Sequence, residues 1–109
     1  MSGWHERLAV RLDRLREAME FEGLEAIYTD DLSEVRWISG FTGSHGAVLV
    51  THTQAHIATD GRYDQQVRSE SPTMAVVIGR HLPALLGAIA AREGVAVHVS
   101  PHRTTVSVL

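Results

Sequence analysis

Apolar residues recur at helical spacing near the start of the chain. Leu8, Leu12, Leu15 and Met19 are separated by four, three and four positions, so they share one stripe of a helix predicted over about residues 4–22. The opposite face of this helix carries mainly arginine, aspartate and glutamate. We therefore expect the apolar stripe to pack on a sheet.

Three short runs predict strands in the first half of the chain. Gly23 stands where a left-handed residue would end the first helix, and residues 24–28 then predict a short strand. Residues 47–50 and 55–59 predict two more strands, joined by a turn short enough for antiparallel pairing.

Two short helices are predicted around these strands. Asp31 or Ser33 can cap the first helix, since either side chain can accept hydrogen bonds from the free amides of the first turn, and Gly40 ends it. The second is predicted over residues 63–70, and Pro72 prevents its continuation.

The last third of the chain predicts a strand, a helix and a strand. Residues 74–78 form a continuous apolar run, typical of a strand covered on both faces. The next helix has Pro83 in its first turn and ends before Gly94. Its apolar positions are Leu82, Leu85, Leu86, Ile89 and Ala90. Valines alternate over residues 95–99 as in a strand, so the element order predicts an α/β fold, mostly parallel with one antiparallel hairpin.

Composition adds limits to this picture. The 109 residues suit one domain, with 44% apolar and 21% charged residues as in ordinary globular proteins. A net charge of −3 and the lack of a basic run argue against nucleic-acid binding. No signal peptide or membrane-spanning segment is visible, and we expect a cytoplasmic protein.

Cysteine and lysine are both missing, and each of these absences removes a class of chemistry. Without cysteine there is no disulfide, thiol nucleophile or cysteine–zinc site. All ten basic residues are arginine, and without lysine neither a phosphate-binding P-loop nor a response-regulator receiver is complete.

The most specific pattern lies between residues 39 and 63. Gly40, Gly43 and Gly46 are spaced by threes, a density expected where backbone bends tightly or approaches another surface. A turn containing Asp60 and Gly61 follows the hairpin.

Three segments of this region resemble the amino-terminal domain of the creatinase, prolidase and aminopeptidase P family, the pita-bread metallopeptidases. They are VRWISGFTGS at residues 35–44, AVLVT at 47–51 and TDGRY at 59–63. Their order, with one hairpin between them, makes the joint match specific. Together the segments are most similar to those of Xaa-Pro aminopeptidases. A weaker similarity extends back to residue 11 and forward to about residue 99.

The resemblance implies a mixed, mostly parallel sheet of five to six strands flanked by helices, with ribonuclease-H-like topology. Residues 1–109 would form a single domain of this type that stops before its last elements. In the family, two divalent metal ions such as manganese are held by two aspartates, one histidine and two glutamates of a carboxy-terminal catalytic domain. This chain has none of those motifs, so we expect the parent protein to be a hydrolase and this chain alone to be inactive.

The histidines and Ser44 suggest other chemistry, but their spacing does not fit it. His52 and His56 are four residues apart, as are His98 and His102, but each pair spans a turn or a strand end, not one helix face. We expect no metal site in this chain. Ser44 has Thr42 two positions before it, where a nucleophile elbow needs glycine.

The segment Asp60-Gly61-Arg62-Tyr63 allows two interpretations. The structural one is a helix-entry turn, in which Asp60 accepts from free amides and Gly61 takes an unusual backbone angle. The functional one is that Arg62 and Tyr63 brace an interface with another domain. We favour the structural role.

The resemblance also implies a function. The domain would lean over the active site of a neighbouring subunit, restrict entry to short proline-containing peptides, and help to form a homodimer. Arg36, Phe41 and His45 are then candidate contacts to substrate or partner chain. Two alternatives remain open: a stand-alone interaction or ligand-binding module, and the amino-terminal domain of a catalytically dead homologue.

Overall fold

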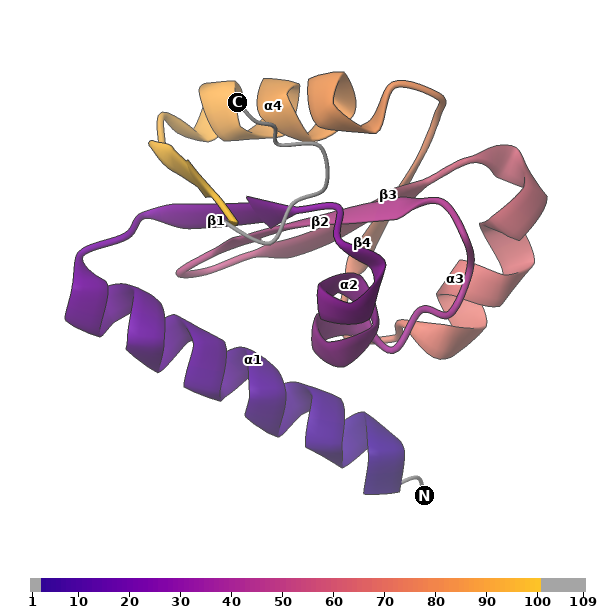
Figure 1. The fold of residues 1–109 in the computed structure, drawn as a ribbon, viewed down its shortest axis with the longest axis horizontal. Helices are drawn as coiled ribbons and strands as arrows, with labels where there is room; N and C mark the ends of the chain where they lie inside the picture. The colour runs from indigo at the N-terminus through magenta and orange to yellow at the C-terminus, as the bar shows by residue number, and fades with distance from the viewer. Residues whose placement is uncertain (1–2, 101–109) are drawn as a thin grey trace.

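A five-stranded mixed sheet organises the computed structural model, which describes residues 3–100 (Figure 1). The strand order is β4-β3-β2-β1-β5. The strands are β1 (Ala26–Thr29), β2 (Gly46–Thr51), β3 (Ala55–Thr59), β4 (Ala75–Ile78) and β5 (Val97–Val99). The sheet confirms the predicted α/β class.

Helices cover both faces of the sheet (Figure 1). They are α1 (Gly3–Glu22), α2 (Leu32–Ser39), α3 (Asp64–Glu70) and α4 (Leu82–Glu93), and a short 3-10 turn, η1 (Gly61–Tyr63), precedes α3. In Figure 1, α4 lies above the sheet, and α1, α2 and α3 lie below it.

The strand directions bring several loops to one edge of the sheet. Strands β1, β2 and β3 pair antiparallel in sequence, β4 is parallel to β3, and β5 is parallel to β1. The carboxyl ends of β1, β3, β4 and β5 therefore share an edge with the start of β2. In open α/β sheets this edge is where ligands usually bind.

Two apolar clusters hold the layers together. The one below the sheet includes Leu12, Met19, Val35, Phe41 and Ile57, all buried. The one above it joins the other face of β1, β2 and β3 to the apolar stripe of α4. The stripes predicted from helical spacing are thus the surfaces that α1 and α4 bury.

The helix boundaries are set by a capping side chain and by glycines, as predicted. Asp31, not Ser33, caps α2, because its carboxylate accepts from the backbone N–H of Glu34 at 3.1 Å. Ser33 instead donates its hydroxyl to Asp31 at 2.6 Å. Gly40 ends α2 with a φ of 84°, and Gly94 ends α4 with a φ of 69°.

Some of the predicted strands differ in detail. The first strand begins at Ala26, because the Leu24 N–H still donates to Met19 of α1. The run at 74–78 uses both faces, but only Met74 is buried, and residues 75–78 are incompletely covered because β4 lies at the sheet edge. Residues 101–109, where any further element would begin, lie outside the described residues.

Gly40 gives a test of this packing. A Cβ added there would lie 2.7 Å from the Glu70 carbonyl oxygen, and the φ of 84° also disfavours any side chain. We expect Gly40→Ala to lower the free energy of unfolding by about 2 kcal/mol, measured by urea denaturation.

Gly87→Ala is the matched control, because Gly87 is exposed within α4 and has nothing within 4 Å of its added Cβ. This change should raise the free energy of unfolding by about 0.5–1 kcal/mol. Equal effects of the two substitutions would contradict the packing described.

Candidate functional site

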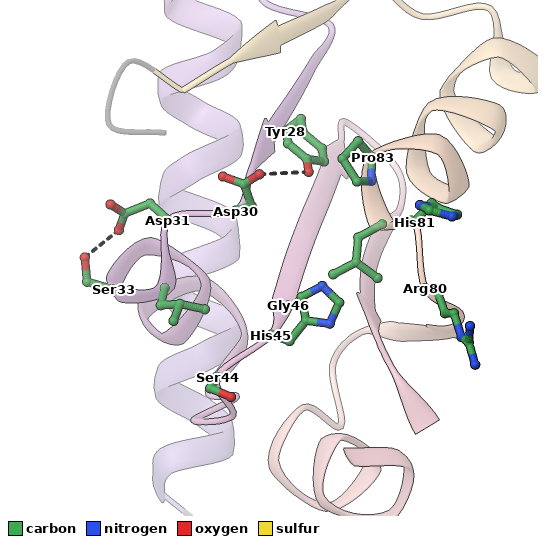
Figure 2. Close-up of a pocket in the computed structure, with 12 residues that line it drawn as sticks. Tyr28, Asp30, Asp31, Ser33, Ser44, His45, Gly46, Arg80, His81 and Pro83 are labelled. Carbon is green, nitrogen blue, oxygen red and sulfur yellow. Dashed lines mark hydrogen bonds between the residues drawn. The ribbon is translucent and has the colours of Figure 1, made fainter. Parts of the chain in front are cut away.

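A hollow of about 590 Å³ opens at the carboxyl edge of the sheet (Figure 2). It lies between the end of β1, the start of α2, the start of β2 and the connection from β4 to α4. Its lining residues are Tyr28, Asp30, Asp31, Leu32, Ser33, Ser44, His45, Gly46, Arg80, His81, Leu82 and Pro83.

The loop from Phe41 to His45 forms one side of this region, and it is built around a buried ring. Phe41 is 1% exposed, and its ring meets the Tyr63 ring edge-on at 5.4 Å. A Cβ on Gly43 would lie 2.2 Å from this ring, and one on Gly46 would lie 3.1 Å from it. The glycine spacing therefore lets the backbone wrap closely around Phe41.

Hydrogen bonds from the η1–α3 segment fix the same loop. The Tyr63 hydroxyl accepts from the Ser44 N–H at 3.2 Å and lies 2.6 Å from the Ser44 hydroxyl. The Glu70 carboxylate accepts from the N–H and the hydroxyl of Thr42, at 2.8 Å and 3.0 Å. We call these contacts, with the His45–Asp60 pair below, the loop clamp.

Charged groups complete the clamp at Asp60. The His45 Nδ1 lies 2.7 Å from one Asp60 carboxylate oxygen, and the Arg62 guanidinium donates to both oxygens at 2.9 Å. The Asp60 side chain is only 16% exposed, whereas that of His45 is 43% exposed. Arg62 first, and His45 second, hold the pKa of the Asp60 carboxyl well below its usual range.

The same contacts affect two neighbouring groups. Asp60 raises the pKa of the Arg62 guanidinium, so this side chain stays charged. Hydrogen bonds from Ser44 lower the pKa of the Tyr63 phenol. Because Ser44 is engaged by Tyr63 and the nearby His45 by Asp60, the described arrangement does not supply a serine–histidine–acid triad.

The hollow has walls of opposite charge. Asp30 and Asp31 follow β1, and Arg80 and His81 lie across from them at the start of α4 (Figure 2). Tyr28 donates its hydroxyl to Asp30 at 3.2 Å, which orients that carboxylate. Such a hollow suits a small polar molecule that carries both charges, as a free amino acid does.

The structure brings together some of the predicted site residues and separates others. His45, Arg62 and Tyr63 meet in the loop clamp, with Arg62 and the His45 ring accessible. Arg36 is exposed on α2 and is not part of the hollow's lining. Phe41 supports the loop from inside and is covered by it.

The turn at Asp60 has the structure that helix-entry chemistry predicts. The Asp60 carboxylate accepts from the Arg62 N–H at 3.0 Å and so caps η1. Gly61 has an unstrained φ and open space around its Cα, so the unusual backbone angle expected there is not observed.

Three residues of the site were not singled out by sequence reasoning: Glu70, Arg80 and His81. Arg80 and His81 follow the apolar strand at 74–78, so the rule that sites lie after parallel strands could have identified them. No local signal connects Glu70 to Thr42, 28 residues away.

The histidines do not gather into a metal centre in the part of the chain that is described. Within residues 3–100, no three histidine, aspartate or glutamate side chains are placed to hold a metal ion. The His52 ring nitrogen lies 2.9 Å from the Leu24 carbonyl, and that of His56 lies 2.8 Å from the Gln54 side chain. Burial lowers the pKa of His56. His102 lies outside the described residues.

Removing the Tyr63 hydroxyl tests the clamp. Tyr63→Phe keeps the edge-on ring contact with Phe41 but loses both contacts to Ser44. We expect the free energy of unfolding to fall by about 1 kcal/mol, measured by urea denaturation. A loss below about 0.2 kcal/mol would indicate that these hydrogen bonds do not hold the loop.

Acid titration tests the charged part of the clamp. Asp60 has a lowered pKa in the fold, so its ionised form stabilises the protein above its unfolded pKa of about 3.9, and this stabilisation is lost as the pH falls further. Wild type should be more stable than Asp60→Asn at about pH 5, and the difference should shrink by about pH 2.5.

The control for this titration is the same pair of proteins in an Arg62→Gln background. Arg62 is the largest cause of the lowered pKa, so the difference at about pH 5 should already be smaller there. A difference that is unchanged by pH, or by loss of Arg62, would contradict the electrostatic account.

Comparisons with known proteins agree with this geometry. The profile of the Creatinase/Prolidase N-terminal domain matches residues 11–108. The chain is 43% identical over 60 residues to a probable Xaa-Pro aminopeptidase P of Phaeosphaeria nodorum, covering 55% of this chain and 8% of that protein. It is 38% identical over 73 residues to Xaa-Pro aminopeptidase 2 of Rattus norvegicus, covering 56% of this chain and 11% of that protein. The chain thus spans only a small part of these relatives.

Solved structures match over nearly the whole described fold. The N-terminal domain of the cytoplasmic peptidase PepQ from Mycobacterium tuberculosis superposes with a TM-score of 0.83 at 39% identity, over 89% of this chain and 77% of that chain. The Xaa-Pro dipeptidase from Bacillus anthracis superposes with a TM-score of 0.83 at 23% identity, over 91% of this chain and 28% of that chain, which shows likeness of fold alone.

None of the helices within residues 3–100 is long and apolar enough to cross a membrane. The profile match covers most of the chain, and the fold superposes on the same domain type. The chain belongs to the creatinase/prolidase N-terminal domain family.

Proposed function

We propose that this chain is the non-catalytic amino-terminal domain of an Xaa-Pro aminopeptidase or dipeptidase, in which it shapes access to the active site. The observation that carries the proposal is the loop clamp, which holds a polar loop rigid at the carboxyl edge while leaving His45 and Arg62 accessible. A loop fixed in this way can act as a wall against which a short peptide is positioned.

The chemistry of peptide hydrolysis is assigned to a separate catalytic domain. Two divalent metal ions such as manganese would supply the activated water there. The described residues of this chain do not fit such a centre, since no three potential ligands converge. This domain would bind and orient the peptide and would exclude longer peptides.

The accessible groups suit proline-containing peptides. Asp60 holds the Nε and Nη2 of Arg62, and this keeps the guanidinium oriented. The remaining N–H groups of the guanidinium can pair with a second carboxylate. Arg36, on α2, adds a second exposed arginine. In a homodimer these groups would face the active site of the neighbouring subunit, and Phe41 would support them from within.

A cytoplasmic location is part of the proposal. It is supported by the likeness to the PepQ domain, which is described as belonging to a cytoplasmic peptidase.

A second candidate function is a stand-alone ligand-binding module. The hollow of about 590 Å³ with walls of opposite charge favours it, because such a site could bind an amino acid without a catalytic domain. The reading frame after Leu109 distinguishes the two: more than about two hundred further residues with clustered aspartate, histidine and glutamate support the peptidase. A stop codon supports the module, and a long continuation without those ligands supports a catalytically dead homologue.

Substitutions in the full-length protein test the gating role. Arg36→Ala and His45→Ala should raise KM for Xaa-Pro peptides by about twofold to fivefold, or change the preferred peptide length, with kcat little changed. Steady-state kinetics on peptides of several lengths measures both effects.

Arg92→Ala is the matched control, since Arg92 is exposed near the end of α4, away from the loop clamp. It should leave KM unchanged. Unaltered kinetics for both Arg36→Ala and His45→Ala on all peptides would overturn the gating proposal.

A further inference from the structure

A second hollow, which we call the α1–α2 groove, lies on the other face of the sheet from α4. It has a volume of about 400 Å³ and is formed by α1, α2, β1 and β5. Its apolar lining includes Leu15, Met19, Leu24, Ile27, Trp37 and Ile38. The Trp37 side chain forms one rim and is exposed, at 45%.

Two carboxylates interrupt this apolar lining: Glu22 at the end of α1, and Glu34 on α2. Glu34 is held in place, because Ser100 donates its hydroxyl to both carboxylate oxygens, at 2.7 Å and 3.0 Å, and Thr29 donates to one of them. A carboxylate offers about four acceptor positions, so these two hydroxyl groups leave room for a cationic donor.

The topology indicates that the crossover helix of a further parallel strand would not cover the groove. Crossovers between parallel strands are right-handed. Helix α3 leads from β3 to β4 in one direction across the sheet, and α4 leads from β4 to β5 in the opposite direction. The two helices therefore lie on opposite faces, as the rule requires (Figure 1). To reach a parallel strand added beyond β5, the chain would cross the sheet in the same direction as it does from β4 to β5. Its crossover helix would therefore lie on the α4 face.

Exposed valines on the α4 face are the surface that such a helix would cover. Val97 and Val99 of β5 line a hollow with Leu86 of α4, and they are 40% and 44% exposed. His98, between them, lines the α1–α2 groove on the opposite face. The crossover helix of an added strand would thus cover the valines and leave the groove uncovered.

We propose that the α1–α2 groove docks an amphipathic helix of a partner protein, with its apolar side chains in the groove and a lysine or arginine paired with Glu34. Charge complementarity is the argument for this occupant: the groove's two carboxylates select a basic residue beside an apolar stripe. An exposed tryptophan at the rim is the kind of anchor that such interfaces use. Arg11 keeps Trp37 in position, because it donates to the Trp37 carbonyl at 3.0 Å and stacks over its ring at 5.3 Å.

Tryptophan fluorescence provides the test, since the chain contains only Trp4 and Trp37. In a Trp4→Phe background, Trp37 reports on the groove alone. The probes are two synthetic helical peptides with the same leucine stripe at positions i, i+3, i+4 and i+7, one with lysine beside the stripe and the other with glutamate. The lysine peptide should shift the Trp37 emission saturably and bind about tenfold more tightly than the glutamate peptide.

Substitutions show whether the groove is the site. Glu34→Gln should remove the preference for the lysine peptide. Ala18→Arg, on the groove wall, should abolish binding, whereas Ala9→Arg, exposed on α1 but outside the groove lining, should not. Circular dichroism confirms that each variant is folded. No saturable shift up to about 500 μM, equal affinity for the two peptides, or full binding by Ala18→Arg would each overturn the proposal.

Discussion

The pairing of Asp60 with His45 and Arg62, together with the Tyr63–Ser44 contact, is the interaction on which the carboxyl edge of this domain depends. It joins the turn after β3 to the loop before β2, so two segments that meet the same sheet edge become one rigid unit. The buried ring of Phe41 lies beneath that unit and requires glycine at position 43 above it. The loop shape, the position of His45 and the mouth of the hollow all follow from this clamp.

The regular elements could be predicted from the sequence because their signals are local. The stripe at Leu8, Leu12 and Met19 requires one buried helix face, and the short, mainly apolar runs at residues 47–50 and 55–59, joined by a short turn, favour paired strands. The helix ends at Gly40 and Gly94 were equally visible, since only glycine adopts the left-handed backbone there at little cost.

The site could be predicted only in part, because its contacts are long-range. Arg62 and Tyr63 were considered as a brace toward another domain. Within this chain Tyr63 contacts Ser44, 19 residues earlier, and Arg62 holds Asp60. Phe41 in a glycine-rich loop reads as an exposed contact, and only the tertiary fold shows that Tyr63 and the loop backbone enclose it. Charge separation across the hollow, between Asp30 and Arg80, depends on strand order, which no local pattern encodes.

Amide hydrogen exchange at Ser44 tests the clamp most directly, because the Ser44 N–H donates to the Tyr63 hydroxyl although the residue lies in an exposed loop. The account predicts exchange at least about tenfold slower than in an unstructured peptide of the same sequence. Exchange of Ser44 at the unstructured rate, in protein whose β2 and β3 amides are protected, would show that the loop is not held and would contradict the account.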